Sequence, residues 1–414
     1  MTPAADAYVV GVGMTPFGRH LERSLADLAS TAVRAALADA DLDAADVGAV
    51  MAGNAVQGAI EGQHGIRGQL MLRDLPFGRV PVVNVENACA SASTALHLAV
   101  AYVAAGAADV VLALGAEKMV TPDKERALAA FHGSWDTAAS ERTLAGLAAF
   151  GAGTPLPSGV EEQTGHSVFM DVYAAFAREH MARHASTREQ FAAVAAKNHA
   201  HSVHNPLAQY RTSFTVEEVL AGRPVAWPLT LPMCSPVSDG AAAAVVCSPA
   251  VARRIGRGRA VRVRASVLAH GGSWDGQDPA EHVSRQTAAR LWERAGLGPS
   301  DVHVAEVHDA TAVGEVQQVE HLGLVPPGEG GRAAQRGETA LGGRIPVNPS
   351  GGLESRGHPI GATGLAQVHE LVTQLRGEAG ARQVEGARIA VAENGGGLIG
   401  LEEAAVAMTV LEAS

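Results

Sequence analysis

Short apolar runs alternate along this chain with longer stretches whose apolar residues recur at helical spacing. The runs are rich in Val and Ala and tend to end at Gly or Asn, which is typical of buried strands. A predicted helix at 24–40 separates the first two runs and places Leu25, Leu28 and Ala32 on one face. The predicted strands are 8–13, 49–51, 80–85, 109–114 and 239–248.

The helix–strand pattern of the first half returns in the second half. A shift of 255 residues places Leu42 on Leu297 and Asp46 on Asp301, and in both copies a strand follows. A second parallel supports the first, because Asn84 leads through Cys89 into a helix and a strand. In the same order, residues 348–352 lead through His358 into a helix at 361–375 and a strand at 388–392. We therefore predict two homologous α/β halves, each a sheet covered by helices.

The segment between the two halves has a different character. Residues 121–224 are rich in Ala, His, Gly and Pro and weak in strand signal, so we expect a helical insertion. The resulting division assigns 1–120 with 225–255 to an N-terminal half, 121–224 to an insertion domain, and 256–414 to a C-terminal half.

Composition and charge exclude some classes of function. Of 414 residues, 47% are hydrophobic and only 4% aromatic, which predicts an aliphatic, closely packed core. A formal net charge of −11 argues against general binding to nucleic acids or membrane surfaces. Because Lys118, Lys124 and Lys197 are the only lysines, a ligand that carries phosphates would require arginine side chains.

The cysteine pattern suggests a reducing compartment. The three cysteines (Cys89, Cys234 and Cys247) form neither a disulfide framework nor a CxxC motif. No apolar run reaches membrane-spanning length, and the first residues lack the features of a signal peptide. We expect a cytoplasmic protein in which Cys234 and Cys247 are packing residues.

Five of the histidines within the insertion raise the question of a metal site. They are His180, His184, His199, His201 and His204. His180 and His184 stand at helical i, i+4 spacing, but no cysteine or carboxylate pattern accompanies them. We therefore expect a solvated helix face and no metal site.

Cys89 stands where a predicted strand leads into a helix of small residues at 91–105. Unpaired backbone N–H groups and the helix dipole favour an anion at such a position. We therefore expect the thiol to lose its proton readily and to act as a nucleophile. The alternative is a small buried hydrophobic residue, as most free cysteines are.

Three distant segments could supply partners for this nucleophile. His308 ends a predicted strand, and His358 lies beside Pro359 in a glycine-rich turn that fixes its imidazole. Residues 393–397, Glu-Asn-Gly-Gly-Gly, follow a buried strand and offer backbone N–H groups that a substrate oxygen can approach closely. A thiolate, an imidazole base and backbone donors are what acyl transfer through a thioester requires.

Together these motifs resemble the thiolase superfamily. The Cys89-Ala-Ser sequence, the Cys-Ser-Pro-Val-Ser-Asp-Gly-Ala sequence at 234–241 and the Gly-His-Pro-Ile-Gly-Ala-Thr-Gly sequence at 357–364 follow one another in family order. The His308-Asp-x-x sequence is similar to that of the sterol-carrier-protein-type branch. The resemblance implies a thiolase fold, with two βαβαβαββ halves in five α-β-α-β-α layers. It also implies a homodimer or dimer of dimers and an acyl-CoA substrate, with no other cofactor.

The resemblance also implies roles for individual residues. Cys89 matches the acylated nucleophile, and His358 matches the base that activates it. His308 stands in the oxyanion hole that His358 lines, and the N–H groups of Cys89 and Gly395 match the other oxyanion hole. The substrate-binding positions implied by the same motifs are Asn348 and Gly351.

The chain departs from the family at the residue that moves the α-proton. Most thiolases carry a second cysteine for this step, but the corresponding positions hold Glu393 and Ala310. Glu393 is a candidate acid/base if burial raises its pKa, and Asp309 is a second candidate. The alternatives are a second step that needs no such base and a site adapted to retro-aldol cleavage.

We therefore expect an acyl-CoA-dependent acyltransferase that forms acyl-Cys89 and makes or breaks a C–C bond. Two alternatives stay open: a CoA-thioester aldolase of the sterol side-chain type, and a non-catalytic thiolase-like subunit. Some members of the branch pair with a small zinc-ribbon, OB-fold protein, which is the partner that the resemblance suggests. Contacts with CoA are expected within 121–224.

Overall fold

The computed structural model describes residues 7–160, 163–256, 258–272 and 274–414. In this part of the chain, nine strands form one sheet, to which the two halves contribute opposite sides. The first half supplies β1 (Ala7–Met14), β2 (Ala49–Gly53), β3 (Val82–Val85), β4 (Val110–Glu117) and β7 (Gly240–Cys247). The second half supplies β8 (Val261–His270), β9 (Val304–Glu306), β10 (Ile389–Ile399) and β11 (Glu402–Ala413).

The two sides of the sheet mirror each other about the contact between β1 and β8. Outward from this contact, one side runs β1, β7, β4, β2, β3 and the other runs β8, β11, β10, β9. β2 pairs with β4 in parallel and β9 with β10 in parallel, whereas β7 and β11 pair antiparallel with both neighbours. The counterpart of β3 is a single parallel bridge between Ala305 and Val347. The internal repeat is therefore confirmed, and the 255-residue shift takes Ala49, which begins β2, onto Val304, which begins β9.

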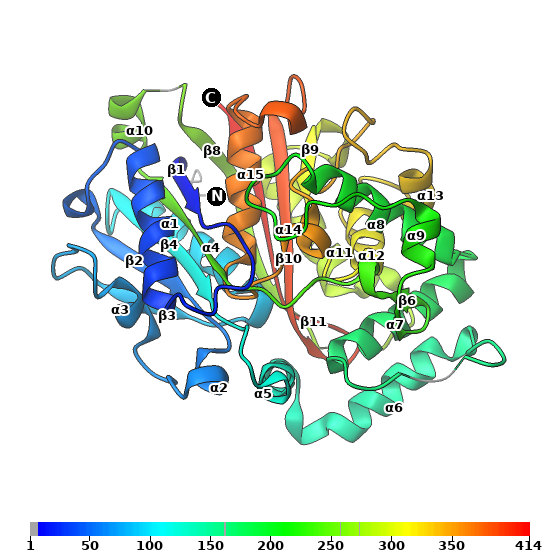
Figure 1. The fold of residues 1–414 in the computed structure, drawn as a ribbon. Coiled ribbons are helices and arrows are strands. Elements are labelled where there is room, and N and C mark those ends of the chain that lie inside the picture. Colours follow the sequence, from blue (N-terminus) through cyan, green and yellow to red (C-terminus); the bar gives the residue numbers. More distant parts are fainter. Residues whose placement is uncertain (1–6, 161–162, 257, 273) are drawn as a thin grey trace.

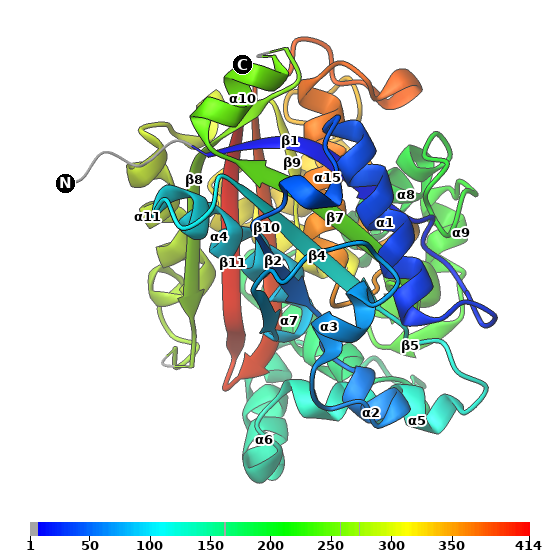
Figure 2. The same ribbon diagram turned by 90° about the vertical axis from the view of Figure 1, so that its left-hand side faces the viewer.

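Helices cover the outer face of each half of the sheet. Two further helices fill the space between the halves. α1 (Leu25–Asp39), α3 (Arg67–Leu72) and α10 (Pro249–Ile255) cover the first side, and α11 (Val283–Ala295) and α12 (Ala312–His321) cover the second. α4 (Ser91–Ala104) and α15 (Thr363–Leu375) pack between strands of both halves. Figures 1 and 2 show α15 between α1 and α11. The predicted five α-β-α-β-α layers are confirmed.

The chain between β4 and β7 forms a helical region that packs against α12. Its elements are α5 (Lys124–Ala129), α6 (Ser140–Phe150), α7 (Val168–His184), α8 (Arg188–Ser202), α9 (Val216–Leu220), β5 (Pro224–Ala226) and β6 (Leu229–Thr230). One apolar cluster joins Phe176 of α7, Phe191 of α8 and Val313 of α12. The remaining helices are α2 (Gln57–Glu61), α13 (Gly330–Gln335) and α14 (Gly352–Arg356). None of the described helices combines the length and the apolar character that crossing a bilayer requires.

Small residues let α4 and α15 approach each other closely. A Cβ atom at Gly364 in α15 would come 1.8 Å from Ser93 Oγ in α4, so this contact requires glycine. The Ser93 hydroxyl donates to Asn394 Oδ1 of β10 at 2.9 Å, inside the protein. These contacts hold the helix that follows Cys89 against the strand that carries residues 393–397.

The prediction that five histidines of the insertion lie on a solvated helix face is wrong for three of them. His180, His199 and His201 are buried because α12 and the loop at Asn348 cover α7 and α8. His180 Nε2 lies 3.2 Å from the Glu320 carboxylate. The sequence spacing identified the shared helix face but not this carboxylate, which lies 140 residues further along the chain.

Candidate active site

Cys89 lies in the single turn Ala88–Ala90 between β3 and α4, and its side chain is half-buried. Ala88 has a φ of 47°, in the left-handed region that costs free energy for a residue with a Cβ atom. β10 supports this turn from behind, because a Cβ atom at Gly396 would lie 2.2 Å from the Asn87 carbonyl oxygen. A strand of the second half thus fixes the turn that presents the thiol.

The electrostatics of Cys89 differ from the sequence prediction. Burial raises the pKa of the Cys89 thiol to about 12, and the nearby Glu117 carboxylate contributes to the rise. Backbone N–H groups of Gly397 and of Cys89 itself act in the opposite direction, but their effect is smaller. The expectation that this thiol loses its proton readily is therefore wrong for the ligand-free protein. Desolvation raises the pKa by more than the backbone N–H groups at the helix end lower it.

Glu117, at the end of β4, is a neighbour of the site that the sequence did not reveal. Its carboxylate accepts hydrogen bonds from Asn54 Nδ2 at 2.7 Å and from the Ala55 and Gly361 N–H groups at 2.8 and 3.1 Å. Burial raises the pKa of this carboxyl group to about 7. Glu117 thereby connects the strand ends of the first half with the turn that carries His358.

His358 lies between α14 and α15, and Thr363 fixes its protonation pattern. Thr363 Oγ1 lies 2.7 Å from His358 Nδ1 and 3.1 Å from the Pro359 carbonyl oxygen. Because a carbonyl can only accept, the hydroxyl donates to Pro359 and accepts from Nδ1–H. Nε2 therefore carries the free lone pair. Burial, with His308 and Arg356 nearby, lowers the pKa of His358 well below 6.5, so the imidazole is neutral.

His308 occupies the loop between β9 and α12. Its backbone N–H donates to Glu393 Oε2 at 2.9 Å, which ties the loop to β10. Burial lowers the pKa of His308 to about 4, so this ring is neutral as well. Its Nε2 atom is buried and has no hydrogen-bond partner among the residues that the structure describes. An unpaired buried nitrogen is costly, so a ligand atom that bonds to it gains free energy.

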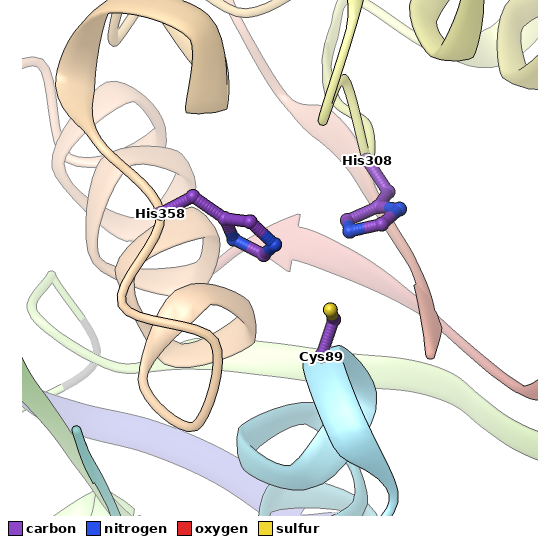
Figure 3. Close-up of side chains that lie close together, drawn as sticks. All are labelled: Cys89, His308 and His358. Carbon is purple, nitrogen blue, oxygen red and sulfur yellow. The ribbon is translucent and has the colours of Figure 1, made fainter. Parts of the chain in front are cut away.

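The structure brings these three side chains together from distant parts of the chain. The Cys89 sulfur and one ring nitrogen each from His308 and His358 all lie within 4.8 Å of one another. The two rings meet edge to face, with centroids 5.3 Å apart. Figure 3 shows the three side chains converging on one space, with the His358 nitrogen farther from the main chain directed into it. A neutral base thus lies beside a protonated thiol.

A cavity of about 380 Å³ opens over this group. Besides the three side chains and Gly395–Gly397, its walls include apolar residues of the insertion, among them Phe131, Phe169 and Met170. Arg19 and Arg223 also line it, and both are exposed. Cys234, interpreted from the sequence as a packing residue, is buried and contributes to the same wall.

Four predicted site residues lie behind the cavity rather than on its wall. Asp309 Oδ1 accepts from the Leu353 N–H at 2.7 Å, which holds α14. Asn348 donates to Glu315 and accepts from the Val307 N–H, while Gly351 packs against Ser202 of α8. The fourth is Glu393, whose carboxylate accepts a hydrogen bond from the His308 N–H. Burial raises the pKa of Asp309 and of Glu393 well above their usual values.

Glu403 is the wall residue that sequence reasoning missed. It lies in β11 and is, among the described residues, the one carboxylate that lines the cavity. It lies after the hairpin turn that follows 393–399, and the residues around it carry no motif of their own. Its position two residues before the apolar stretch 405–411 is the only sequence signal that this side chain has a defined place in a strand.

Comparisons with known proteins agree with this architecture. The family models described as "Thiolase, N-terminal domain" and "Thiolase C-terminal domain-like" match residues 7–219 and 265–409. An acetyl-CoA acetyltransferase of Methanothermobacter thermautotrophicus is 40% identical over 95% of this chain and 96% of its own length. Sterol carrier protein 2 of Oryctolagus cuniculus is 37% identical over 98% of this chain and 72% of its own.

A solved structure is similar over the full chain. It is described as "Ltp2-ChsH2(DUF35) aldolase" and superposes with a TM-score of 0.78 at 25% identity, covering 100% of this chain and 99% of that one. Sequence and structure therefore agree, and the chain belongs to the thiolase family of acyltransferase enzymes.

Proposed function

We propose that this enzyme transfers an acyl group from an acyl-CoA through a thioester on Cys89, and makes or breaks a C–C bond in the second half-reaction. The observation that carries the proposal is the convergence of the Cys89 sulfur with the ring nitrogens of His308 and His358 within 4.8 Å, beneath an open cavity.

In the first half-reaction the Cys89 thiol gives its proton to His358 Nε2 as the sulfur attacks the thioester carbonyl. The high pKa of the thiol and the low pKa of the imidazole oppose formation of a resting ion pair. Proton transfer therefore accompanies attack, and the imidazole then returns the proton to the departing CoA thiolate. The backbone N–H groups of Cys89 and Gly395 are the proposed donors to the carbonyl oxygen during this step.

In the second half-reaction His308 serves the other thioester. Its Nε2 has no partner in the described part of the chain, and the ring is neutral, so this nitrogen can donate one hydrogen bond to a substrate oxygen. His308 is therefore the proposed donor to the second oxyanion; His358 lies beside it, but after acylation its Nε2 again carries only a lone pair. This chemistry uses side chains and backbone N–H groups of the chain, with CoA thioesters as substrates.

The cavity suits an acyl-CoA in shape and charge. The apolar insertion residues would contact the acyl and pantetheine groups, whereas Arg19 and Arg223 would contact the phosphates. Two arginines at one cavity stand out in a chain whose overall charge is −11. The expected homodimer or dimer of dimers, and the cytoplasmic location, remain part of the proposal.

A second candidate is a CoA-thioester aldolase, which the structure described as an aldolase with a DUF35 chain supports. By analogy, this chain would then require a partner with a zinc-ribbon and OB-fold. Against it, the full set of Cys89, His308 and His358 is what acyl transfer needs. A scaffolding role without catalysis is disfavoured for the same reason.

The test uses a panel of 3-ketoacyl-CoAs and 3-hydroxyacyl-CoAs, with product thioesters separated by chromatography. We expect cleavage of a 3-ketoacyl-CoA to depend on free CoA and to fall by at least about a thousandfold in the Cys89→Ala variant. An aldolase would instead cleave a 3-hydroxyacyl-CoA without free CoA, release an aldehyde and tolerate Cys89→Ala. That result would overturn the proposal.

A further inference from the structure

The family's second cysteine is absent, so the structure must show which group can move the α-proton. Its positions hold Glu393 in β10 and Ala310 in the loop after His308. A Claisen condensation needs a base at the α-carbon of the second acyl-CoA, beside the acylated Cys89. That base must reach the cavity.

Glu393 does not meet this requirement. Its Oε2 accepts the His308 N–H at 2.9 Å, and its side chain lies behind the His308 loop. The described residues that line the cavity include Gly395, Gly396 and Gly397 from the same strand, but not Glu393. Glu393 is therefore a residue that positions His308.

Glu403 does meet it. The residue lies on β11, which pairs with β10, and its side chain stands beside Gly395. A Cβ atom added at Gly395 would lie 2.8 Å from Glu403 Cγ and 3.5 Å from Oε1. Gly395 and Glu403 line the same cavity as Cys89 and His308. The carboxylate thus lies next to the backbone that the proposed first oxyanion site uses.

Donors from two helices hold the Glu403 carboxylate in one orientation. Gln318 Nε2 of α12 donates to Oε1 at 2.7 Å, and the Ser284 hydroxyl of α11 donates to Oε2 at 3.1 Å. His282 Nε2 lies 3.5 Å from Oε2, and its ring stacks on His321 with centroids 4.3 Å apart. A base that is held in place needs little reorganisation to accept a proton.

The histidines beside Glu403 also border a second cavity. His282, which lies 3.5 Å from Glu403 Oε2, and His321 line a second cavity of about 280 Å³. Glu403 thus lines the catalytic cavity and contacts a histidine that lines a second cavity. Such an arrangement offers a route by which the carboxylate can exchange its proton.

We propose that Glu403 is the catalytic acid/base that replaces the second cysteine. The inference rests on the proposed function. In condensation, the Cα–H bond of the second acyl-CoA breaks, its proton passes to Glu403, and the carbanion attacks the acyl carbonyl on Cys89. The C–C bond forms as the C–S bond breaks, and the Cys89 thiolate takes one proton, equal to the one removed from the α-carbon. No oxidant or reductant is needed.

The experiment compares two half-reactions in wild type, Glu403→Gln and Glu393→Gln. Acylation of Cys89 by an acyl-CoA is measured as a gain in intact mass. Exchange of the α-hydrogens of that acyl-CoA in D₂O is measured as a gain in thioester mass. The matched control is Glu412→Gln, on the same strand but paired with Arg262 and Arg264 away from the cavity.

We expect Glu403→Gln to be acylated at a rate within about threefold of wild type, which also shows that it is folded. Its α-hydrogen exchange should fall by about 10²- to 10⁴-fold, the range of a lost general base. Exchange that persists in Glu403→Gln, or that disappears in Glu393→Gln instead, would overturn the inference. A wild-type enzyme that is acylated but shows no exchange would also overturn it. If wild type is not acylated at all, the proposed function itself fails.

Discussion

Cys89 and His358 are both uncharged before substrate arrives, which distinguishes this site from a preformed thiolate–imidazolium pair. The pKa of the thiol is raised to about 12, first by burial and then by Glu117, while the pKa of the imidazole is lowered well below 6.5. The thiol is thus protonated at neutral pH, and the thiolate fraction rises only as pH approaches the raised pKa.

This state predicts the titration of the free enzyme. The difference in ultraviolet thiolate absorbance between wild type and Cys89→Ser should stay flat from pH 6 to about pH 9 and rise only above it. Subtraction of the variant's spectrum cancels the absorbance of Cys234 and Cys247, whose thiols are also buried. A rise centred between pH 6 and pH 8 would show that helix-end stabilisation, and not burial, dominates.

Thr363 should set the efficiency of His358 as a base. Thr363→Val removes the acceptor for Nδ1–H, so Nε2 is no longer the only nitrogen with a lone pair. One lost hydrogen bond of about 1 kcal/mol predicts a roughly fivefold slower acylation of Cys89, measured by rapid quench and intact mass.

Thr363→Ser is the matched control, since it keeps the hydroxyl and should recover most of the rate. Equal losses in the Val and Ser variants would indicate that packing, and not the tautomer, is what Thr363 provides.

The sequence identified the chemistry of these residues but not their environment. Cys89, His308 and His358 stand in motifs, so their identity was readable, and the structure brings them together. The pKa of Cys89 depends on burial and on Glu117, which enters the site through folding and carries no local signal. Glu403 was missed for the same reason.

At the scale of elements, the contact between α4 and α15 restricts the choice of side chain most tightly. α4 follows Cys89, α15 follows His358, and Gly364 lets them meet at Ser93. Their separation therefore sets the distance between the nucleophile and its base.

Gly364→Ala should destabilise the protein by about 1–3 kcal/mol, because a methyl group there overpacks a buried contact. Urea denaturation measures the change. Gly78→Ala is the control, since a Cβ atom at Gly78 meets no atom within 4 Å. A Gly364→Ala protein as stable as the control would show that the two helices can separate at little cost.

The apolar pattern predicted some elements better than others. Continuous apolar runs identify β1, β4 and β7, whose residues are almost all buried. β8 alternates between buried and half-buried residues and was not found by such runs, nor was β11 at the end of the chain. The β5–β6 hairpin was missed because its strands have only three and two residues.

At the scale of the whole molecule, the active site belongs to neither half alone. Cys89 comes from the first half, His308 and His358 come from the second, and most of the cavity wall comes from the chain between β4 and β7. The repeat was predictable because it follows from local patterns, whereas the five layers were predicted from the resemblance to the thiolase superfamily. The proposed division at 120, 224 and 255 stays a prediction.

Arg19 lies in the first half, Arg223 lies in the chain between β4 and β7, and both should bind the phosphates of CoA. The double variant Arg19→Gln, Arg223→Gln should raise KM for an acyl-CoA about tenfold at low salt and leave kcat unchanged, as two exposed charge contacts predict. KM for the same acyl group on pantetheine, which lacks these phosphates, should not change. Arg253→Gln, an exposed arginine on α10, is the control. Equal shifts for both substrates would contradict phosphate recognition.

The most direct test of the account is the intact mass of the protein after brief exposure to an acyl-CoA, in wild type and in His358→Ala. We predict that wild type gains the mass of one acyl group, that digestion locates it on the peptide containing Cys89, and that His358→Ala is acylated about 10²- to 10⁴-fold more slowly. An unchanged mass in wild type during turnover, or an acyl group on a residue other than Cys89, would contradict the account.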